Sequence, residues 1–320
     1  MDRGFQGRRH RASIAAIPEN GELIVQANAP VGIIGLGLMG TALSERLIDA
    51  KIPVIGFDIE AAGSEKLKAR GGMVAASVRE LAGRSRTIIV AVYSGEQVEA
   101  LLEDLLSGAG SARPIVICTT TCAPDEITRL ARRAASAGIA LVEAPISGTS
   151  ADVRAGAAVA LVAGDPSAID SVGTILQILC PRSLRVGAVG DASRTKLAIN
   201  LILQNNRAAL AEGIAFAERL GLDGHAFLAA ARESAAYSRV MESKGEKMLT
   251  RDFRPHSHIS QTLKDAELIL EQARRLGLLL PMTTTQADLL RAAIGLEGPD
   301  SDSAAVIEAI RRPAASGAIR

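Results

Sequence analysis

The stretch DASRTKLAINLILQNNRAALAEGIAFAERLG, residues 191–221, decides the architecture of this chain. Its apolar residues recur at spacings of three, four and seven, which is typical of one long amphipathic helix. Asp191 or Ser193 can cap the start of this helix, and Gly221 is placed to end it. At about 1.5 Å per residue, thirty residues span roughly 45 Å, more than the width of a small domain. We therefore expect the helix to join two domains.

On both sides of this helix the sequence pattern is consistent with two different domains. Upstream, short β-branched runs alternate with helical patterns, which predicts a doubly wound parallel sheet of the Rossmann type. Downstream the pattern indicates helices alone. The predicted fold class is α/β, with a Rossmann-type domain at 30–190 and an all-α carboxyl-terminal domain at 191–320. Strands are expected at 31–34, 53–57, 73–75, 87–92, 115–118, 138–142, 159–163 and 184–186, and helices around 65–69, 98–106, 125–137, 225–232, 260–276 and 284–294.

The first 29 residues differ from the rest. They begin with a basic run that includes Arg8, Arg9 and Arg11, but no apolar signal-peptide core follows. We expect a disordered extension at 1–29.

Composition excludes several classes of function. The chain has 320 residues, 48% of them hydrophobic, and a net charge of +1, so no basic surface favours nucleic acid. Aromatic residues make up 2%, with no tryptophan, and no apolar run is long enough for a transmembrane helix. The spacing of the three cysteines, Cys118, Cys122 and Cys180, does not fit the disulfide framework of a secreted protein, so we expect the protein to be cytoplasmic. His256 and His258 share a loop without an apparent third ligand, so no metal site is expected.

Glycines follow the first predicted strand in the order Gly35-Leu-Gly37-Leu-Met-Gly40, and a helical pattern comes next. This is the G-x-G-x-x-G fingerprint between a strand and a helix, as dinucleotide binding requires. Gly35 allows a tight turn, Gly37 lets the backbone approach a pyrophosphate, and Gly40 lets helix and strand pack closely. Leu38 and Met39 open the helix, whose free N–H groups favour phosphates.

The second predicted strand ends in Asp58, about twenty residues after the glycines, where the ribose-binding acid belongs. Its carboxylate would accept hydrogen bonds from both ribose hydroxyls and repel a 2′-phosphate. Ile59 and Glu60 follow, and no arginine is there to accept that phosphate. We expect NAD as the cofactor rather than NADP.

Further candidates lie at strand ends and on the long helix. Val92, Tyr93 and the run 119–121 leave two successive strands, although the threonines can equally be a loop that caps the next helix. The small-residue loop 147–150 either offers donors to an anion or is an ordinary turn. Lys196 and Asn200 are four residues apart and share one helix face, which is where we expect any proton chemistry to take place.

Four motifs in one order resemble the β-hydroxyacid dehydrogenases, the family of 3-hydroxyisobutyrate dehydrogenase and tartronate semialdehyde reductase. They are Gly35-Leu-Gly-Leu-Met-Gly40, Glu143-Ala-Pro-Ile-Ser-Gly-Thr149, the helix with Lys196 and Asn200, and Lys264-Asp265. The likeness covers nearly everything from Val31 to about Ile310.

The resemblance implies a role for each matching residue. Lys196 would be the catalytic acid/base, Asn200 would orient the substrate, and Ser147 and Gly148 would hold the substrate carboxylate. Val92, Tyr93 and Thr121 would contact the cofactor, with Lys264 beside the nicotinamide. The resemblance also implies a helical domain that mediates homodimers or homotetramers.

Thr149 stands where the family has a second loop glycine, Tyr93 where it usually has proline, and Cys118 where an acid is common. Because Thr149 belongs to the substrate-binding motif, the identity of the acid stays open. Relatives that reduce sulfolactaldehyde are similar at Thr149 but carry an arginine at the position of Gly148.

We therefore predict reversible hydride transfer between NAD(P), with NAD preferred, and a short 3-hydroxy carboxylate or its semialdehyde. The alternatives are a sulfonate-aldehyde reductase of the same family and a dinucleotide-binding sensor without catalysis. A decarboxylating 6-phosphogluconate-type dehydrogenase ranks lower, because such chains are longer in the helical part. An imine reductase also ranks lower, because those enzymes usually replace the lysine.

Overall fold

The computed structural model describes residues 15–16 and 29–312. The chain divides into two compact units. Among the described residues, unit 1 contains 15–16, 29–120, 124–148 and 152–193, and unit 2 contains 121–123, 149–151 and 194–312.

Unit 1 is built on a sheet of ten strands among the described residues. Six of them pair in parallel in the order β4-β3-β2-β5-β6-β7. This order changes direction between β2 and β5, which confirms the predicted doubly wound sheet and marks the place where ligands bind such sheets. The six strands are β2 (Val31–Ile34), β3 (Val54–Phe57), β4 (Met73–Val74), β5 (Thr87–Val90), β6 (Ile115–Cys118) and β7 (Leu141–Glu143).

The far end of the sheet is mixed rather than parallel. β9 (Val159–Ala163) runs antiparallel to β7 and β8 (Ile146–Ser147), and β10 (Arg182–Gly187) runs parallel to β9. β1 (Ala15–Ala16) pairs antiparallel with β10, so two residues of the expected disordered extension belong to the sheet. Residues 1–14 and 17–28 of the expected extension lie outside the described residues.

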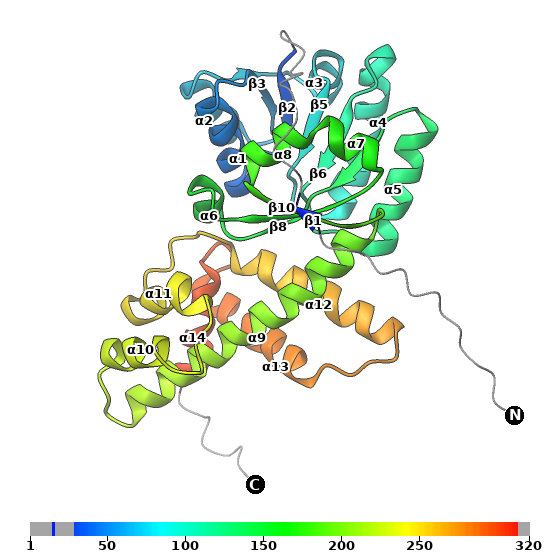
Figure 1. Ribbon diagram of the computed structural model, residues 1–320. Helices are drawn as coiled ribbons and strands as arrows, with labels where there is room; N and C mark the ends of the chain where they lie inside the picture. The colour runs from blue at the N-terminus through cyan, green and yellow to red at the C-terminus, as the bar shows by residue number, and fades with distance from the viewer. Residues whose placement is uncertain (1–14, 17–28, 313–320) are drawn as a thin grey trace, which may run out of the picture. The chain divides into compact units, whose positions relative to one another are not determined.

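Helices cover both faces of the sheet (Figure 1). On one face α1 packs beside α8, and on the other α3, α4 and α5 pack in a row. Ile33, Ile89 and Ile117 of neighbouring strands are fully buried between these layers. The helices are α1 (Leu38–Asp49), α2 (Ala61–Ala69), α3 (Val78–Arg84), α4 (Gly95–Ala109), α5 (Pro124–Ser136), α6 (Ser150–Arg154), α7 (Pro166–Ser171) and α8 (Gly173–Leu179), with a 3-10 turn η1 (Gly110–Ala112).

Unit 2 is helical, as predicted. Its longest helix is α9 (Asp191–Arg219), which buries Leu210, Ala211 and Ile214 in a core shared with the other helices. The α9 helix ends near the predicted glycine: Gly221 has a φ of +79°, and its N–H donates to the carbonyl of Glu218. The other elements are α10 (Gly224–Arg232), the π-helical turn η2 (Met241–Gly245), α11 (Glu246–Thr250), α12 (Ile259–Arg275), α13 (Pro281–Glu297), the 3-10 turn η3 (Ser303–Ala305) and α14 (Val306–Arg311).

No described helix combines the length and the apolar character that crossing a membrane requires.

Candidate active site

The glycine turn between β2 and α1 has three distinct geometries. Gly35 has a φ of +91°, and a Cβ there would lie 2.5 Å from the carbonyl oxygen of Ala91. A Cβ on Gly40 would lie 1.8 Å from the carbonyl oxygen of Gly35, so helix and turn touch at this point. A Cβ on Gly37 would meet no atom within 4 Å. The backbone at Gly37 is therefore open to a ligand, while the other two glycines are required by the fold.

Leu38 and Met39 begin α1 at this turn. The first N–H groups of any helix have no acceptor within the helix, and the helix dipole makes this end partly positive. The open backbone at Gly37 and the start of α1 together can receive a pyrophosphate.

Asp58 follows β3 directly and is tied to the same turn. One carboxylate oxygen accepts the N–H of Leu36 at 2.5 Å, and the other accepts the N–H of Glu60 at 2.8 Å. These bonds fix the carboxylate beside the glycine turn, where a ribose of a bound dinucleotide can reach it.

Two further predicted residues lie beyond β5 at the carboxyl edge of the sheet. The N–H of Val92 donates to Thr120 Oγ1 at 3.2 Å, and that hydroxyl in turn donates to the carbonyl of Val92 at 3.1 Å. The N–H of Tyr93 donates to Gln97 Oε1 at 2.8 Å, and the Tyr93 side chain is 43% exposed. The ends of β5 and β6 are thus locked together beside the glycine turn.

The small-residue loop leaves β7 and passes through the short strand β8. Ser147 of β8 pairs with Val159 of β9. Gly148 follows with a φ of +145°, a conformation that favours glycine. A Cβ on Gly148 would come within 3.1 Å of the Cβ atoms of Ala158 and Asp152. Gly148 is therefore required by the loop itself, whatever it binds.

Lys196 and Asn200 lie on one face of α9 in unit 2, as their spacing predicts, and are 6% and 5% exposed. Burial lowers the pKa of Lys196 to about 8. The negative charge of Asp265 opposes this shift, and the positive charge of Lys264 adds to it. A lysine with this pKa is present in both protonation states near neutral pH, as a general acid and base must be.

Asp265 of α12 connects the other polar side chains of this cluster. Its Oδ2 accepts a hydrogen bond from Asn200 Nδ2 at 2.8 Å, and its Oδ1 lies 3.1 Å from Lys264 Nζ. Lys264 Nζ also donates to the carbonyl of Thr121 at 3.0 Å. One buried carboxylate therefore orients both Asn200 and Lys264 and adds negative charge near Lys196.

The predicted site residues divide between the two units. Unit 1 holds the glycine turn, Asp58, Val92, Tyr93, Ser147 and Gly148, and unit 2 holds Thr121, Thr149, Lys196, Asn200 and Lys264.

Sequence reasoning gave no role to Asp265, although it adjoins Lys264. It also gave none to Glu143, whose buried carboxylate lies at the first turn of α9. The sequence offered one clue for each: Asp265 is next to the candidate Lys264, and Glu143 ends a strand expected to be buried.

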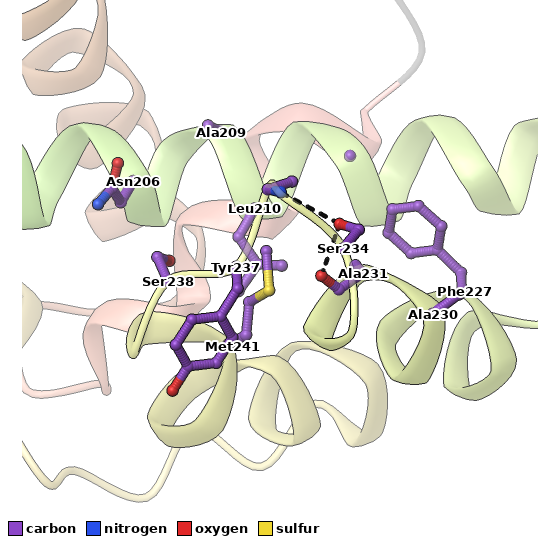
Figure 2. Close-up of a pocket in the computed structure, with 12 residues that line it drawn as sticks. Asn206, Ala209, Leu210, Phe227, Ala230, Ala231, Ser234, Tyr237, Ser238 and Met241 are labelled. Carbon is purple, nitrogen blue, oxygen red and sulfur yellow. Dashed lines mark hydrogen bonds between the residues drawn. The ribbon is translucent and has the colours of Figure 1, made fainter.

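A cavity of about 490 Å³ lies elsewhere in unit 2, between α9, α10 and the segment that leads into η2 (Figure 2). Figure 2 shows Leu210, Phe227, Tyr237 and Met241 among its lining, which is mainly apolar. The α9 residues that line the cavity begin ten positions after Lys196, about 15 Å along a helix. This cavity is therefore separate from the Lys196 cluster.

Two protein-family models match the chain, one over most of unit 1 and the other over most of unit 2. Residues 30–187 match the NAD binding domain of 6-phosphogluconate dehydrogenase, and residues 190–310 match the NAD-binding domain of NADP-dependent 3-hydroxyisobutyrate dehydrogenase.

Individual relatives are similar over nearly their whole length. An L-threonate dehydrogenase of Cupriavidus necator is 28% identical, over 86% of this chain and 94% of its own. A 2-hydroxy-3-oxopropionate reductase of Escherichia coli is 29% identical, over 88% of this chain and 96% of its own. The crystal structure of a 3-hydroxyisobutyrate dehydrogenase from Salmonella typhimurium superposes with a TM-score of 0.81 at 24% identity, over 88% of this chain and 99% of its own.

The fold, the glycine turn and these matches define an oxidoreductase that uses a nicotinamide dinucleotide. More narrowly, the chain belongs to the β-hydroxyacid dehydrogenase family.

Proposed function

We propose that the protein transfers a hydride reversibly between NAD and a short 3-hydroxy carboxylate or its semialdehyde, with Lys196 as the general acid/base. The observation that carries this proposal is the buried position of Lys196, which lowers its pKa to about 8. The names of the relatives, which act on L-threonate and 2-hydroxy-3-oxopropionate, support a small polyhydroxy acid or semialdehyde as the substrate.

The described residues fit a dinucleotide. The open backbone at Gly37 and the first N–H groups of α1 would hold the pyrophosphate, and Asp58 would accept hydrogen bonds from a ribose. Because a 2′-phosphate would meet the negative charge of Asp58, we propose NAD as the preferred cofactor. Val92, Tyr93, Thr121 and Lys264 would contact the nicotinamide half.

A bound nicotinamide would supply the acceptor for the hydride of the carbinol carbon, or its donor in the reverse direction. Neutral Lys196 takes the proton of the substrate hydroxyl as the carbonyl forms, and in the reverse direction its ammonium group gives the proton back. Ser147 and Gly148 hold the substrate carboxylate, and Asn200, itself oriented by Asp265, helps to orient the substrate. Thr149 belongs to the same loop, so its hydroxyl and methyl groups bear on which acid is accepted.

A substitution series tests the role of Lys196. Lys196→Met keeps an unbranched side chain one atom shorter and removes the amine, so turnover should fall at least about a hundredfold while NAD binding stays within about twofold. Lys68→Met, on the exposed surface of α2, is the matched control and should change neither quantity. Normal turnover of Lys196→Met with every accepted substrate would disprove the assignment.

A substrate panel separates the candidate functions. L-threonate, 3-hydroxyisobutyrate, 2-hydroxy-3-oxopropionate and a sulfonate aldehyde are each assayed with NAD and with NADP by the absorbance of the reduced cofactor. Turnover of the sulfonate alone would favour the sulfonate-aldehyde reductase. Tight NAD binding with no turnover of any substrate would favour a sensor.

We further propose a cytoplasmic homodimer or homotetramer. Cys118, Cys122 and Cys180 are buried free thiols, which suits a reducing compartment. In unit 2, Phe216 and Leu279 are 66% and 89% exposed, and large apolar side chains of this kind favour packing against another copy. Light scattering after size exclusion gives the oligomer mass directly, and a monomer at all concentrations would contradict the proposal.

A further inference from the structure

Glu143 ends β7 and is 1% exposed, and its carboxylate binds the start of α9. Its Oε1 accepts the N–H of Ser193 at 3.2 Å and the hydroxyl of Ser193 at 2.6 Å. Its Oε2 accepts the N–H of Gly190. The acid that binds the first turn of α9 therefore comes from a strand about fifty residues earlier in the chain.

This arrangement differs from the cap expected from the sequence. The carboxylate of Asp191 accepts the N–H of Ala188, and the hydroxyl of Ser193 donates to Glu143. N–H groups at the start of α9 that lack an acceptor within the helix, and the positive end of its dipole, are instead matched by the buried carboxylate of Glu143. Burial raises the pKa of Glu143, and the hydrogen bonds from Ser193 and Gly190 oppose that rise.

Glu143 also adjoins the loop that contains Ser147 and Gly148. The N–H of Ala144, the next residue, donates to the carbonyl of Cys118 at 2.8 Å, so the chain leaves β7 in a fixed direction. On the other side, Lys196 follows Ser193 by three residues in α9, within one turn of the helix. One side chain thus connects the start of the loop to the turn that precedes Lys196.

We propose that Glu143 is a positioning residue that fixes the first turn of α9 and so sets the direction in which Lys196 presents its amine. The inference rests on the acid/base role proposed above for Lys196. Rotating a helix by one residue moves a side chain by about 100° around its axis, so a looser first turn misplaces the amine without altering it chemically.

Glu143→Gln tests the inference, because it keeps the shape of the side chain but places an amide N–H against the N–H groups of α9. We expect kcat to fall about ten- to a hundredfold, with NAD affinity within about twofold of the parent. The matched control is Asp165→Asn, which changes another capping carboxylate of unit 1, the one that accepts the N–H of Ser167 and Ala168 in α7. It should leave kcat unchanged. An equal loss of kcat in both variants would overturn the proposal.

Ser193→Ala is a second variant that perturbs the same contact less, and it tests the proposal if Glu143→Gln does not fold. It removes the hydroxyl donor and leaves both N–H bonds to Glu143, so kcat should fall a few-fold with a normal melting temperature. Unchanged kcat in this variant, at full occupancy of NAD, would count against the proposal.

A double-substitution cycle with Lys196→Met distinguishes this inference from the proposed function. If Glu143 acts through Lys196, adding Glu143→Gln to Lys196→Met should cost less than about twofold. A further tenfold loss would overturn the positioning role alone. A fully active Lys196→Met variant would instead overturn the proposed function.

Discussion

The lowered pKa of Lys196 makes a quantitative prediction about the pH dependence of turnover. With a pKa of about 8, about one tenth of the lysine is neutral at pH 7 and about nine tenths at pH 9. Oxidation of the hydroxy acid needs the neutral form, so kcat in that direction should rise about tenfold over this range and then level off. Reduction needs the ammonium form and should fall above about pH 8 by the same titration.

The alternative outcome is clearly different. A lysine at its ordinary value of 10.5 would give a rise of about a hundredfold between pH 7 and 9, with no plateau. The assay is the initial rate of cofactor reduction at saturating substrate and NAD, with the NAD affinity titrated at each pH. A rise that continues to pH 10, or a profile that Lys196→Arg leaves unchanged, would refute the reasoning.

The charges near Lys196 give this prediction its control. Asp265 raises the pKa of Lys196, and Lys264 lowers it. Asp265→Asn should therefore move the midpoint of the oxidation profile to lower pH. A midpoint that moves upward in Asp265→Asn would show that another group titrates.

Three further outcomes follow from the geometry. Gly37→Ala places its Cβ in open space, so it should keep the melting temperature of the parent and lose NAD affinity. Gly40→Ala would bring its Cβ against a backbone oxygen, so the free energy of unfolding in urea should fall by about 1–3 kcal/mol. Asp58→Ala should weaken or reverse the preference for NAD over NADP, measured as the ratio of the two affinities by titration. An unchanged ratio would show that Asp58 does not select the cofactor. Lys244→Met should cost about 3–5 kcal/mol of unfolding free energy, because it leaves Asp302, buried and 2.6 Å from the amine, without its counter-ion; a loss below about 1 kcal/mol would contradict this.

The parts of the fold that depend on local pattern were predictable from the sequence. The period of α9 and the glycine that ends it are local, and the structure has the helix at Asp191–Arg219. The strand expected at 138–142 was placed too early. Gly138 has a φ of +73° and its N–H still bonds the end of α5, so β7 begins only at Leu141. β1 and β8, with two residues each, are too short to show a period.

The candidate site was predictable only as far as motifs identify single residues. The spacing of Lys196 and Asn200 predicts one shared face, and both are buried on α9. No sequence pattern indicates that Asp265 binds Asn200 or that Glu143 binds Ser193, because each pair is brought together by tertiary packing across 65 and 50 positions. Local propensity does not contain that information.

The two tyrosines of the chain have a practical use. Tyr93 follows β5 in unit 1, Tyr237 lines the apolar cavity of unit 2, and both are about half exposed. Since tryptophan is absent, all ultraviolet emission of the protein above the phenylalanine range comes from these two rings. Replacing either one with phenylalanine leaves a single fluorophore in the opposite unit, so melting of each half can be recorded separately without attaching a dye.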